Sequence, residues 1–438
     1  PAIFALALAL SFGSVEVKRA AINAVPVVCR IGTHIFHLAN AIQNLRGWGP
    51  TARRAIEAFY LGKSAQDLAY QIIKYRQRDG WTHNDLLQLS HAYAPTLEHN
   101  AIFRWATRGT TSGVSIPLIE AYEKIQKAKS LLDVCALIRD HKLPHEAIPT
   151  QWLKEPAVWD TLLSIGMPYT AMLRSLSRMT QIGLVKDLSE TATLISDHLV
   201  DPDSIRKARV HPISLLMALK TYSSGRGKRA KMQGDESTTW RPVQQIIDAL
   251  DTAFYLAFGN IEPINKPILL ALDVSASMAV NSVAGVEGLS PREASAALAL
   301  VTARVEPKHA FMAFTHRPVD IAISPKMRLD DVVKKISNLP FGGTDCALPM
   351  LVALKNEIHV ECFEVITDNE TWAGDIHPSQ ALVKYRTECK VPDAKLAVLA
   401  MTSTEFSLSD PNDRGMMDCC GMDSSTPQLI SEFFRGNV

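Results

Sequence analysis

The sequence of 438 residues has little of what defines several protein classes. Its seven cysteines, an odd number without any Cys-x-x-Cys pair, argue against a disulfide framework or a zinc ribbon and favour a reducing, cytoplasmic setting. With 22 Gly, 24 Pro and no sustained heptad pattern, the chain is neither collagen-like nor a long coiled coil. No apolar run approaches the roughly 20 residues that a membrane span needs, so we expect no membrane partner.

The chain opens on the apolar stretch PAIFALALAL, which lacks the basic flank of a signal peptide. We interpret it as a buried helix. Because the chain begins with Pro rather than Met and inside a helical pattern, we expect further helical sequence before residue 1.

Hydrophobic residues make up 47% of the chain and charged residues 21%, enough to bury a large core in two or three domains. The net charge of +1 conceals a division, since residues 1–266 carry +8 and residues 267–438 carry −7. A basic half of this kind indicates an anionic partner, for which nucleic acid is the usual candidate. Scattered, solvated surface charge is the alternative.

Up to about residue 258, apolar residues recur at helical spacing and strand-like alternation is nearly absent. Thr82 followed by Asp85 is typical of a capping box at the start of a helix. Short helices joined by short loops predict stacked antiparallel helical pairs over residues 1–260. The polar, basic segment 223–240 is expected to be a mobile loop.

From residue 267 to residue 438, apolar strands alternate with helices, which predicts a doubly wound parallel sheet. We expect strands at ILLALDV, HAFMAFTH, FEVITD and AKLAVLAM, and helices near 294–304, 345–355 and 379–386.

Oxygen-bearing side chains follow the predicted strands, where ligands bind in doubly wound sheets. These are Asp273, Ser275 and Ser277 in the pattern DxSxS, Thr344 in GGTD and Asp368 in TDNE. Hydroxyl and carboxylate oxygens suit a hard divalent cation, and we expect Mg²⁺, with one coordination place open to an external carboxylate or phosphate. Helix caps and turns at strand ends are the alternative explanation.

A second candidate site is the basic, aromatic segment 72–91. Four-residue spacing places Lys74 and Arg78 on one face of a predicted helix, and Arg76, Trp81 and His91 lie nearby. Such a set can hold phosphates while rings contact bases. Stabilisation of a helix C-terminus by the cations, with Trp81 in the core, competes with this interpretation.

Together these segments resemble the Ro ribonucleoprotein (TROVE-domain) family, and the chain is similar to bacterial Ro orthologs of the Rsr type. The resemblance rests on KYRQRDGWTHNDLLQLSH, ARVHPISLLMALKTY, LALDVSASM, GGTDCALPM, TDNETWAG and DPNDRGMMDCCGMD, which run from the first hundred residues almost to the end. It implies an all-helical HEAT-like repeat ring, monomeric, followed by a von Willebrand factor A domain. It also implies a metal-ion-dependent adhesion site at Asp273, Ser275, Ser277, Thr344 and Asp368.

The resemblance implies that small noncoding Y RNA binds on the outer surface at Lys74, Arg78 and His91, and that single-stranded ends of misfolded RNA enter the ring. It further implies a role in RNA quality control with an exoribonuclease partner, polynucleotide phosphorylase. We therefore expect a non-enzymatic RNA-binding protein. A metal-dependent protein-adhesion module is the alternative function, and a metal-dependent hydrolase is disfavoured because no positioned general base stands out.

Overall fold

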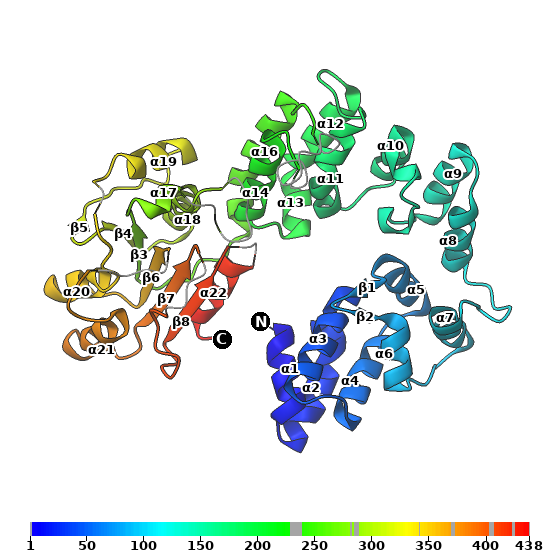
Figure 1. Cartoon of the computed structure of the whole chain (residues 1–438), viewed down its shortest axis with the longest axis horizontal. Coiled ribbons are helices and arrows are strands. Elements are labelled where there is room, and N and C mark those ends of the chain that lie inside the picture. The colour runs from blue at the N-terminus through cyan, green and yellow to red at the C-terminus, as the bar shows by residue number, and fades with distance from the viewer. Residues whose placement is uncertain are drawn as a thin grey trace. The chain divides into compact units, whose positions relative to one another are not determined.

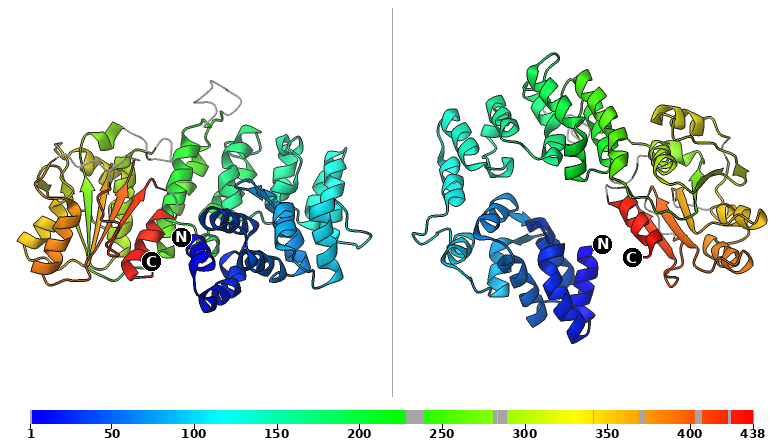
Figure 2. Two further views of the ribbon diagram at one scale, coloured as in Figure 1. Left: turned by 60° about the horizontal axis from the view of Figure 1, so that its bottom comes forward. Right: turned by 180° about the vertical axis from the view of Figure 1, so that it is seen from behind.

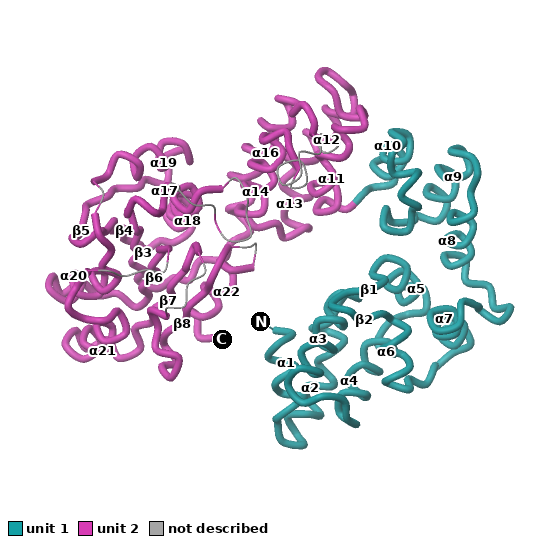
Figure 3. Tube along the Cα trace, viewed as in Figure 1, with its two compact units in different colours: residues 1–167 teal, residues 168–438 magenta. Residues whose placement is uncertain are grey.

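The computed structural model describes residues 2–227, 239–280, 283, 289–340, 342–368, 373–402, 407–422 and 425–437. Residues 228–238 of the loop predicted to be mobile lie outside this set. The chain divides into two compact units, Pro1–Met167 and Pro168–Val438 (Figure 3). The predicted domain limits, 1–260 and 267–438, stay a prediction. Within the described residues, no helix combines the length and hydropathy that a membrane span requires.

Unit 1 is helical, as the spacing of its apolar residues predicts. Consecutive helices pack side by side, α1 on α2 and α3, and α8 on α9 (Figure 1). Serine or threonine caps begin several of them, such as Ser14, Ser64 and Ser130, each accepting a backbone N–H three residues on. The helices are α1 (Ala2–Phe12), α2 (Val15–Val28), α3 (Gly32–Leu45), α4 (Pro50–Leu61), α5 (Ala65–Lys74), α6 (His83–Ser90), α7 (Leu97–Arg108), α8 (Pro117–Lys127), α9 (Leu131–His141), η1 (His145–Ala147), η2 (Trp152–Lys154) and α10 (Pro156–Ser164).

The opening stretch is the helix α1, but the expectation that it is buried holds for one face only. Leu6 and Leu10 are buried, whereas Phe4, Leu8 and Phe12 are exposed. The four-residue spacing of these three places them in one stripe along the helix.

A two-stranded hairpin follows α5 where the sequence predicted that one helix would continue from Lys74 through Arg78. Helix α5 ends at Lys74, and β1 (Gln77–Arg78) pairs antiparallel with β2 (Trp81–Thr82). The turn residues Asp79 and Gly80 both have positive φ, 53° and 79°, as a two-residue hairpin of the primed type demands. Lys74 and Arg78 therefore do not share a helix face. The capping box of Thr82 and Asp85 is confirmed at the start of α6.

Unit 2 begins with further helices and continues into the α/β domain. Helix α14 packs against α16, and α16 also contacts α12. These helices are α11 (Tyr169–Gln181), α12 (Glu190–Leu199), α13 (Pro202–Ala208), α14 (Pro212–Ser223), α16 (Gln244–Leu256) and η4 (Ala257–Asn260).

The α/β domain contains a six-stranded sheet of order β5-β4-β3-β6-β7-β8. The four predicted strands are confirmed and run parallel, β8 adds a parallel edge, and the short β5 pairs antiparallel with β4. The sheet is therefore mixed and not wholly parallel. The connection between β4 and β5 is short and reverses the direction of the chain, so β5 lies antiparallel beside β4. Its strands are β3 (Ile268–Asp273), β4 (His309–Phe314), β5 (Pro318–Val319), β6 (Cys362–Thr367), β7 (Lys395–Ala400) and β8 (Met416–Cys420).

Helices cover both faces of this sheet (Figure 2). Leu269, Phe363 and Leu396 belong to one core cluster with residues of α20 and α21, whereas Ile268 and Glu364 face α18 and α22. This alternation along each strand makes the domain doubly wound. Its helices are α17 (Ser277–Val280), α18 (Pro291–Val305), α19 (Leu329–Ser337), α20 (Leu348–Lys355), α21 (Pro378–Glu388) and α22 (Thr426–Arg435).

The connection from η4 into β3 is fixed to the α/β domain. The buried carboxylate of Glu306, just after α18, accepts the backbone N–H of Ile264 at 2.8 Å and that of Asn265 at 3.2 Å. The ammonium groups of Lys266 and Lys395 donate to the carbonyls of Phe434 and Phe433, in the last turn of α22. Cations at this position satisfy carbonyls that a helix end leaves open.

Candidate functional sites

The candidate cation site starts from Asp273, the last residue of the buried strand β3. One oxygen of its carboxylate accepts the Ser275 backbone N–H at 2.8 Å, and the other accepts the hydroxyl of Thr367 at 2.7 Å. Because Thr367 ends the neighbouring strand β6, this bond ties two strand ends together. The Asp273 side chain is thereby held in a single orientation.

The two serines of the DxSxS pattern lie together beside this carboxylate. The Ser275 and Ser277 hydroxyls are 3.0 Å apart, and Ser277 is the first residue of the short helix α17. Two hydroxyl oxygens at this separation can both reach one small cation. The chain geometry after β3 therefore brings three of the five predicted residues to one place.

Asp368 follows Thr367 directly and is buried, and its Oδ1 has no hydrogen-bond partner among the described residues. Thr344 is also buried, in the loop before α20. The carbonyl of Thr344 accepts the Ala373 N–H at 3.0 Å, which fastens this loop to the one that follows β6. All five predicted residues thus lie at the carboxyl edge of the sheet.

The electrostatics of this edge favour a positive charge. Burial, and to a smaller degree the negative charge of Asp368, raise the pKa of Asp273 to about 6. Two neighbouring carboxylates that are shielded from water repel each other. A bound cation offsets this repulsion.

The chemistry of the donor set fits a hard cation with bound water better than a zinc-type centre. In the described part of the chain no three His, Cys, Asp or Glu side chains converge on one point. The candidate set instead offers two carboxylates and three hydroxyls, and the buried, unpartnered Asp368 Oδ1 is an oxygen that still needs a donor or a cation.

Sequence reasoning missed the role of Thr367 at this edge. Thr367 is the first residue of the TDNE segment. Only the pairing of β3 with β6 shows that its hydroxyl reaches Asp273. A threonine at a strand end, next to an acidic residue, carries no signal in the sequence that distinguishes it from a turn residue.

The second candidate site surrounds the β1–β2 hairpin of unit 1. Arg76 and Arg78 are exposed, and Trp81, directly opposite Arg78, is half-buried. The hairpin packs on α3, where the ring of His37 pairs with Asp79 at its tip. The structure thus brings the guanidinium groups to the surface on a short, supported turn.

Aromatic rings accompany two cations of this surface, Lys74 and Arg76. The Lys74 ammonium lies 5.4 Å from the ring centre of Tyr70 and 5.5 Å from that of Tyr75, and the Arg76 guanidinium lies 5.7 Å from that of Tyr122. Burial alone would lower the pKa of Lys74, but attraction to Tyr70, Tyr75 and Glu146 outweighs it, so the pKa is raised. Lys74 is therefore cationic at neutral pH.

Trp81 belongs to an aromatic pair that sequence reasoning did not find. Its ring meets that of Trp48 edge to face, with centres 5.4 Å apart. The alternative interpretation placed Trp81 in the core. The structure agrees only in part, because the rings of Trp81 and Trp48 are each half-buried. Their position beside the hairpin leaves ring surface next to the exposed Arg78.

His91 is separate from the hairpin. It is exposed and caps the C-terminus of α6 in the left-handed conformation, with φ 54°. An eight-residue helix is about 12 Å long, so His91 lies roughly that far from the β2 end of α6. The five predicted contacts therefore form a hairpin group and one distant imidazole.

Comparisons with known proteins cover the whole chain. The TROVE domain model matches residues 1–225 and the Ro60 vWA domain model matches residues 267–434. The chain is 37% identical to the RNA-binding protein RO60 of Deinococcus radiodurans, over all of this chain and 82% of that protein. It is 34% identical to the RNA-binding protein RO60 of Caenorhabditis elegans, over 95% of this chain and 73% of that one.

A solved structure agrees. The crystal structure of the Deinococcus radiodurans RO (RSR) protein superposes with a TM-score of 0.86 at 36% identity, covering all of this chain and 87% of that one.

Proposed function

The chain belongs to the Ro60 family, with a TROVE domain followed by a Ro60 vWA domain, and from this premise we propose that it is a non-enzymatic RNA-binding protein. The observation that carries the proposal is the hairpin surface, where exposed Arg76 and Arg78 stand beside half-buried Lys74 and Trp81. Cations bind phosphates and neighbouring rings contact bases, which is how single-stranded and looped RNA is held. The net charge of +8 over residues 1–266 supports the same polyanionic partner.

The proposed RNA is a small noncoding Y RNA, bound on the basic surface through Lys74, Arg78 and His91, with Arg76 and Trp81 as further contacts. A second RNA class, misfolded RNA with a single-stranded end, enters the cavity of the helical ring. The protein acts in RNA quality control beside an exoribonuclease, polynucleotide phosphorylase, in the cytoplasm. The proposals about the RNA classes, the exoribonuclease and the compartment follow from the resemblance of the sequence motifs to the Ro family.

Salt-dependent binding of a labelled Y RNA tests the surface. In the Lys74→Ala/Arg78→Ala protein the slope of log affinity against log salt should fall by about 2, because each lost phosphate contact removes close to one unit. A Lys308→Ala/Lys334→Ala protein loses the same charge from exposed positions of the acidic half and should keep the slope. Equal slopes for all three proteins would contradict the proposal, as would RNA cleavage by the purified protein that chelation abolishes.

A metal-dependent adhesion site is a second candidate function, favoured by the buried and unpartnered Oδ1 of Asp368. Asp273, Ser275, Ser277, Thr344 and Asp368 would hold Mg²⁺, which supplies a positive charge to an acidic group of a partner protein. The chain's residues fix the donor oxygens in place through the Thr367–Asp273 and Ser275–Asp273 hydrogen bonds.

Calorimetric titration with Mg²⁺ tests this site. Asp368→Asn should weaken Mg²⁺ binding at least 10-fold, because a hydrogen bond or ion contact to a charged group is worth about 1.5–3 kcal/mol. Asp393→Asn, an exposed acid of the same domain, is the matched control and should bind as the parent does. Parent protein that binds no Mg²⁺ would remove this candidate.

A further inference from the structure

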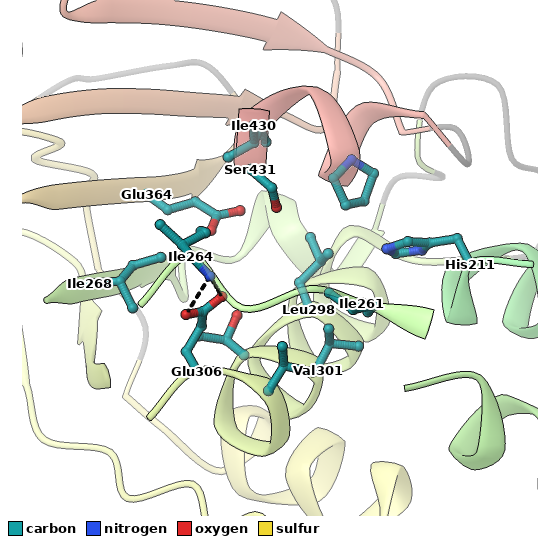
Figure 4. Close-up of a pocket in the computed structure, with 13 residues that line it drawn as sticks. His211, Ile261, Ile264, Ile268, Leu298, Val301, Glu306, Glu364, Ile430 and Ser431 are labelled. Atoms are coloured by element: carbon teal, nitrogen blue, oxygen red, sulfur yellow. Dashed lines mark hydrogen bonds between the residues drawn. The ribbon is translucent and has the colours of Figure 1, made fainter. Parts of the chain in front are cut away.

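A cavity lies on the face of the sheet that α18 and α22 cover, away from the strand-end cluster (Figure 4). It opens to solvent, and its empty volume, open solvent included, is about 450 Å³. Aliphatic side chains form most of its wall, among them Ile268, Leu298, Val301 and Ile430. All of these residues belong to unit 2.

Glu364 projects into this cavity from the middle of the buried strand β6 (Figure 4). It is only 7% exposed, yet in the described part of the chain no hydrogen bond or ion pair joins its carboxyl to another side chain. Its carboxyl is therefore presented to the cavity, where a ligand can supply the hydrogen-bond donors that the surrounding side chains do not.

A second carboxyl faces the same cavity. Glu306 is 6% exposed, and its two oxygens accept the backbone N–H groups of Ile264 and Asn265. These bonds hold the Glu306 carboxylate in place without adding a positive charge. Burial first, and then the negative charge of Glu306, raise the pKa of Glu364 to about 7.

No cation of the described chain balances these two acids. The nearby ammonium groups of Lys266 and Lys395 donate to the carbonyls at the end of α22. His211 also lines the cavity, but burial lowers its pKa to about 4, so its ring is neutral. Its Nδ1 accepts the Ile213 N–H at 3.2 Å, which leaves Nε2 as the protonated nitrogen.

We propose that this cavity binds a small aliphatic amine in its ammonium form, with the nitrogen on Glu364 and the alkyl stem against Leu298, Val301 and Ile430. An ammonium group brings three donors and a positive charge to two carboxyls that have neither. The apolar wall takes the stem, and the two acids exclude anions. This site is independent of the RNA surface and of the strand-end cluster.

The probe is n-butylammonium, with n-butanol as the uncharged molecule of similar shape. Binding to the full chain at pH 8, where Glu364 is mostly ionised, is measured by saturation-transfer NMR and calorimetry. Butylammonium should bind saturably, and butanol at least 10-fold more weakly, since a charge-assisted hydrogen bond is worth roughly a factor of 10 to 100.

Three variants decide the assignment. Glu364→Gln keeps the shape of the side chain and should weaken butylammonium binding at least 10-fold. Glu361→Gln removes a partly exposed acid three residues earlier and should bind as the parent does. Ser431→Leu fills the cavity from α22 without touching the acids, so it reports on the cavity even if Glu364→Gln folds poorly.

Loss of binding in Glu364→Gln or in Ser431→Leu, with Glu361→Gln unchanged, supports the proposal. Absent binding of butylammonium to the parent overturns it, and so does equal binding of butanol. Undiminished binding both in Ser431→Leu and in a folded Glu364→Gln protein also overturns it, because the amine then binds elsewhere.

Discussion

The hydroxyl of Thr367 donates a 2.7 Å hydrogen bond to the Oδ2 of Asp273, although the two residues are 94 positions apart in the sequence. Both are buried, at 0% and 2% exposure, at the ends of adjacent parallel strands. This bond and the Ser275 N–H leave the carboxylate of Asp273 oriented toward the serine hydroxyls before any cation arrives.

Thr367→Val removes that donor while keeping the shape of the side chain. We expect Mg²⁺ affinity to fall roughly 10-fold or more, because a hydrogen bond to a charged group contributes about 1.5–3 kcal/mol and the carboxylate is no longer held in place. Calorimetric Mg²⁺ titration gives the affinity. Thr387→Val, at an exposed helix position whose hydroxyl only bonds its own helix, should leave the affinity unchanged.

Gly80→Ala tests the hairpin that presents Arg78. Gly80 has φ 79°, where an alanine costs about 1–2 kcal/mol, and the open space around it means that strain of the turn is the sole penalty. RNA affinity should drop about 5-fold or more as the turn rearranges. Gly259→Ala has the same open surroundings without positive φ and should keep both affinity and melting temperature. Unchanged RNA binding by the Gly80 variant would mean that Arg78 acts independently of the turn.

Glu364 makes stability depend on pH. Its pKa in the folded protein is about 7, above the ordinary value of 4.5. Between these values the unfolded chain has lost the proton while the folded chain keeps it, so the free energy of unfolding falls as pH rises from about 4.5 to about 7. The full loss is about 3 kcal/mol, reached above pH 7. Scanning calorimetry should therefore show the melting temperature of Glu364→Gln rising relative to the parent between pH 5 and pH 8; a constant difference would contradict this.

Tyr255 joins α16 to the α/β domain within unit 2. The guanidinium groups of Arg304 and Arg328 lie 4.7 Å and 4.9 Å from its ring centre, and its hydroxyl accepts the Leu329 N–H at 3.0 Å. Tyr255→Leu should lower the free energy of unfolding by about 2 kcal/mol, because two cation–π contacts and one hydrogen bond disappear. Tyr255→Phe keeps the ring and should lose only about half as much in urea unfolding.

The α/β domain was predictable because its apolar strands are short, continuous and separated by helical spacing, as in the ILLALD of β3. The strand-end rule also predicted that Asp273 and Asp368 would share one edge, without knowledge of the register. The first half was predicted as helical for the same reason of periodicity.

The hairpin escaped prediction although its signal was present. Asp79-Gly80 is the dipeptide of a two-residue turn, but the helical pattern on both sides outweighed it. The amine cavity had no sequence signal at all. Its polar residues include His211, Glu306, Glu364 and Ser431, which come from four separate parts of the chain, and only packing brings them together.

The hydrogen bonds of the Glu306 carboxylate set how far the α/β domain can be trimmed at its start without losing a buried contact. A protein that started at Lys266 would lose the Ile264 and Asn265 N–H donors and leave the buried Glu306 carboxyl without these partners, facing the same cavity as Glu364. One that started at Ile261 would retain both donors. The six residues 261–266, before the predicted boundary at 267, are therefore structurally part of the sheet domain. The segment where the net charge changes sign is bonded into that domain and is not a free linker.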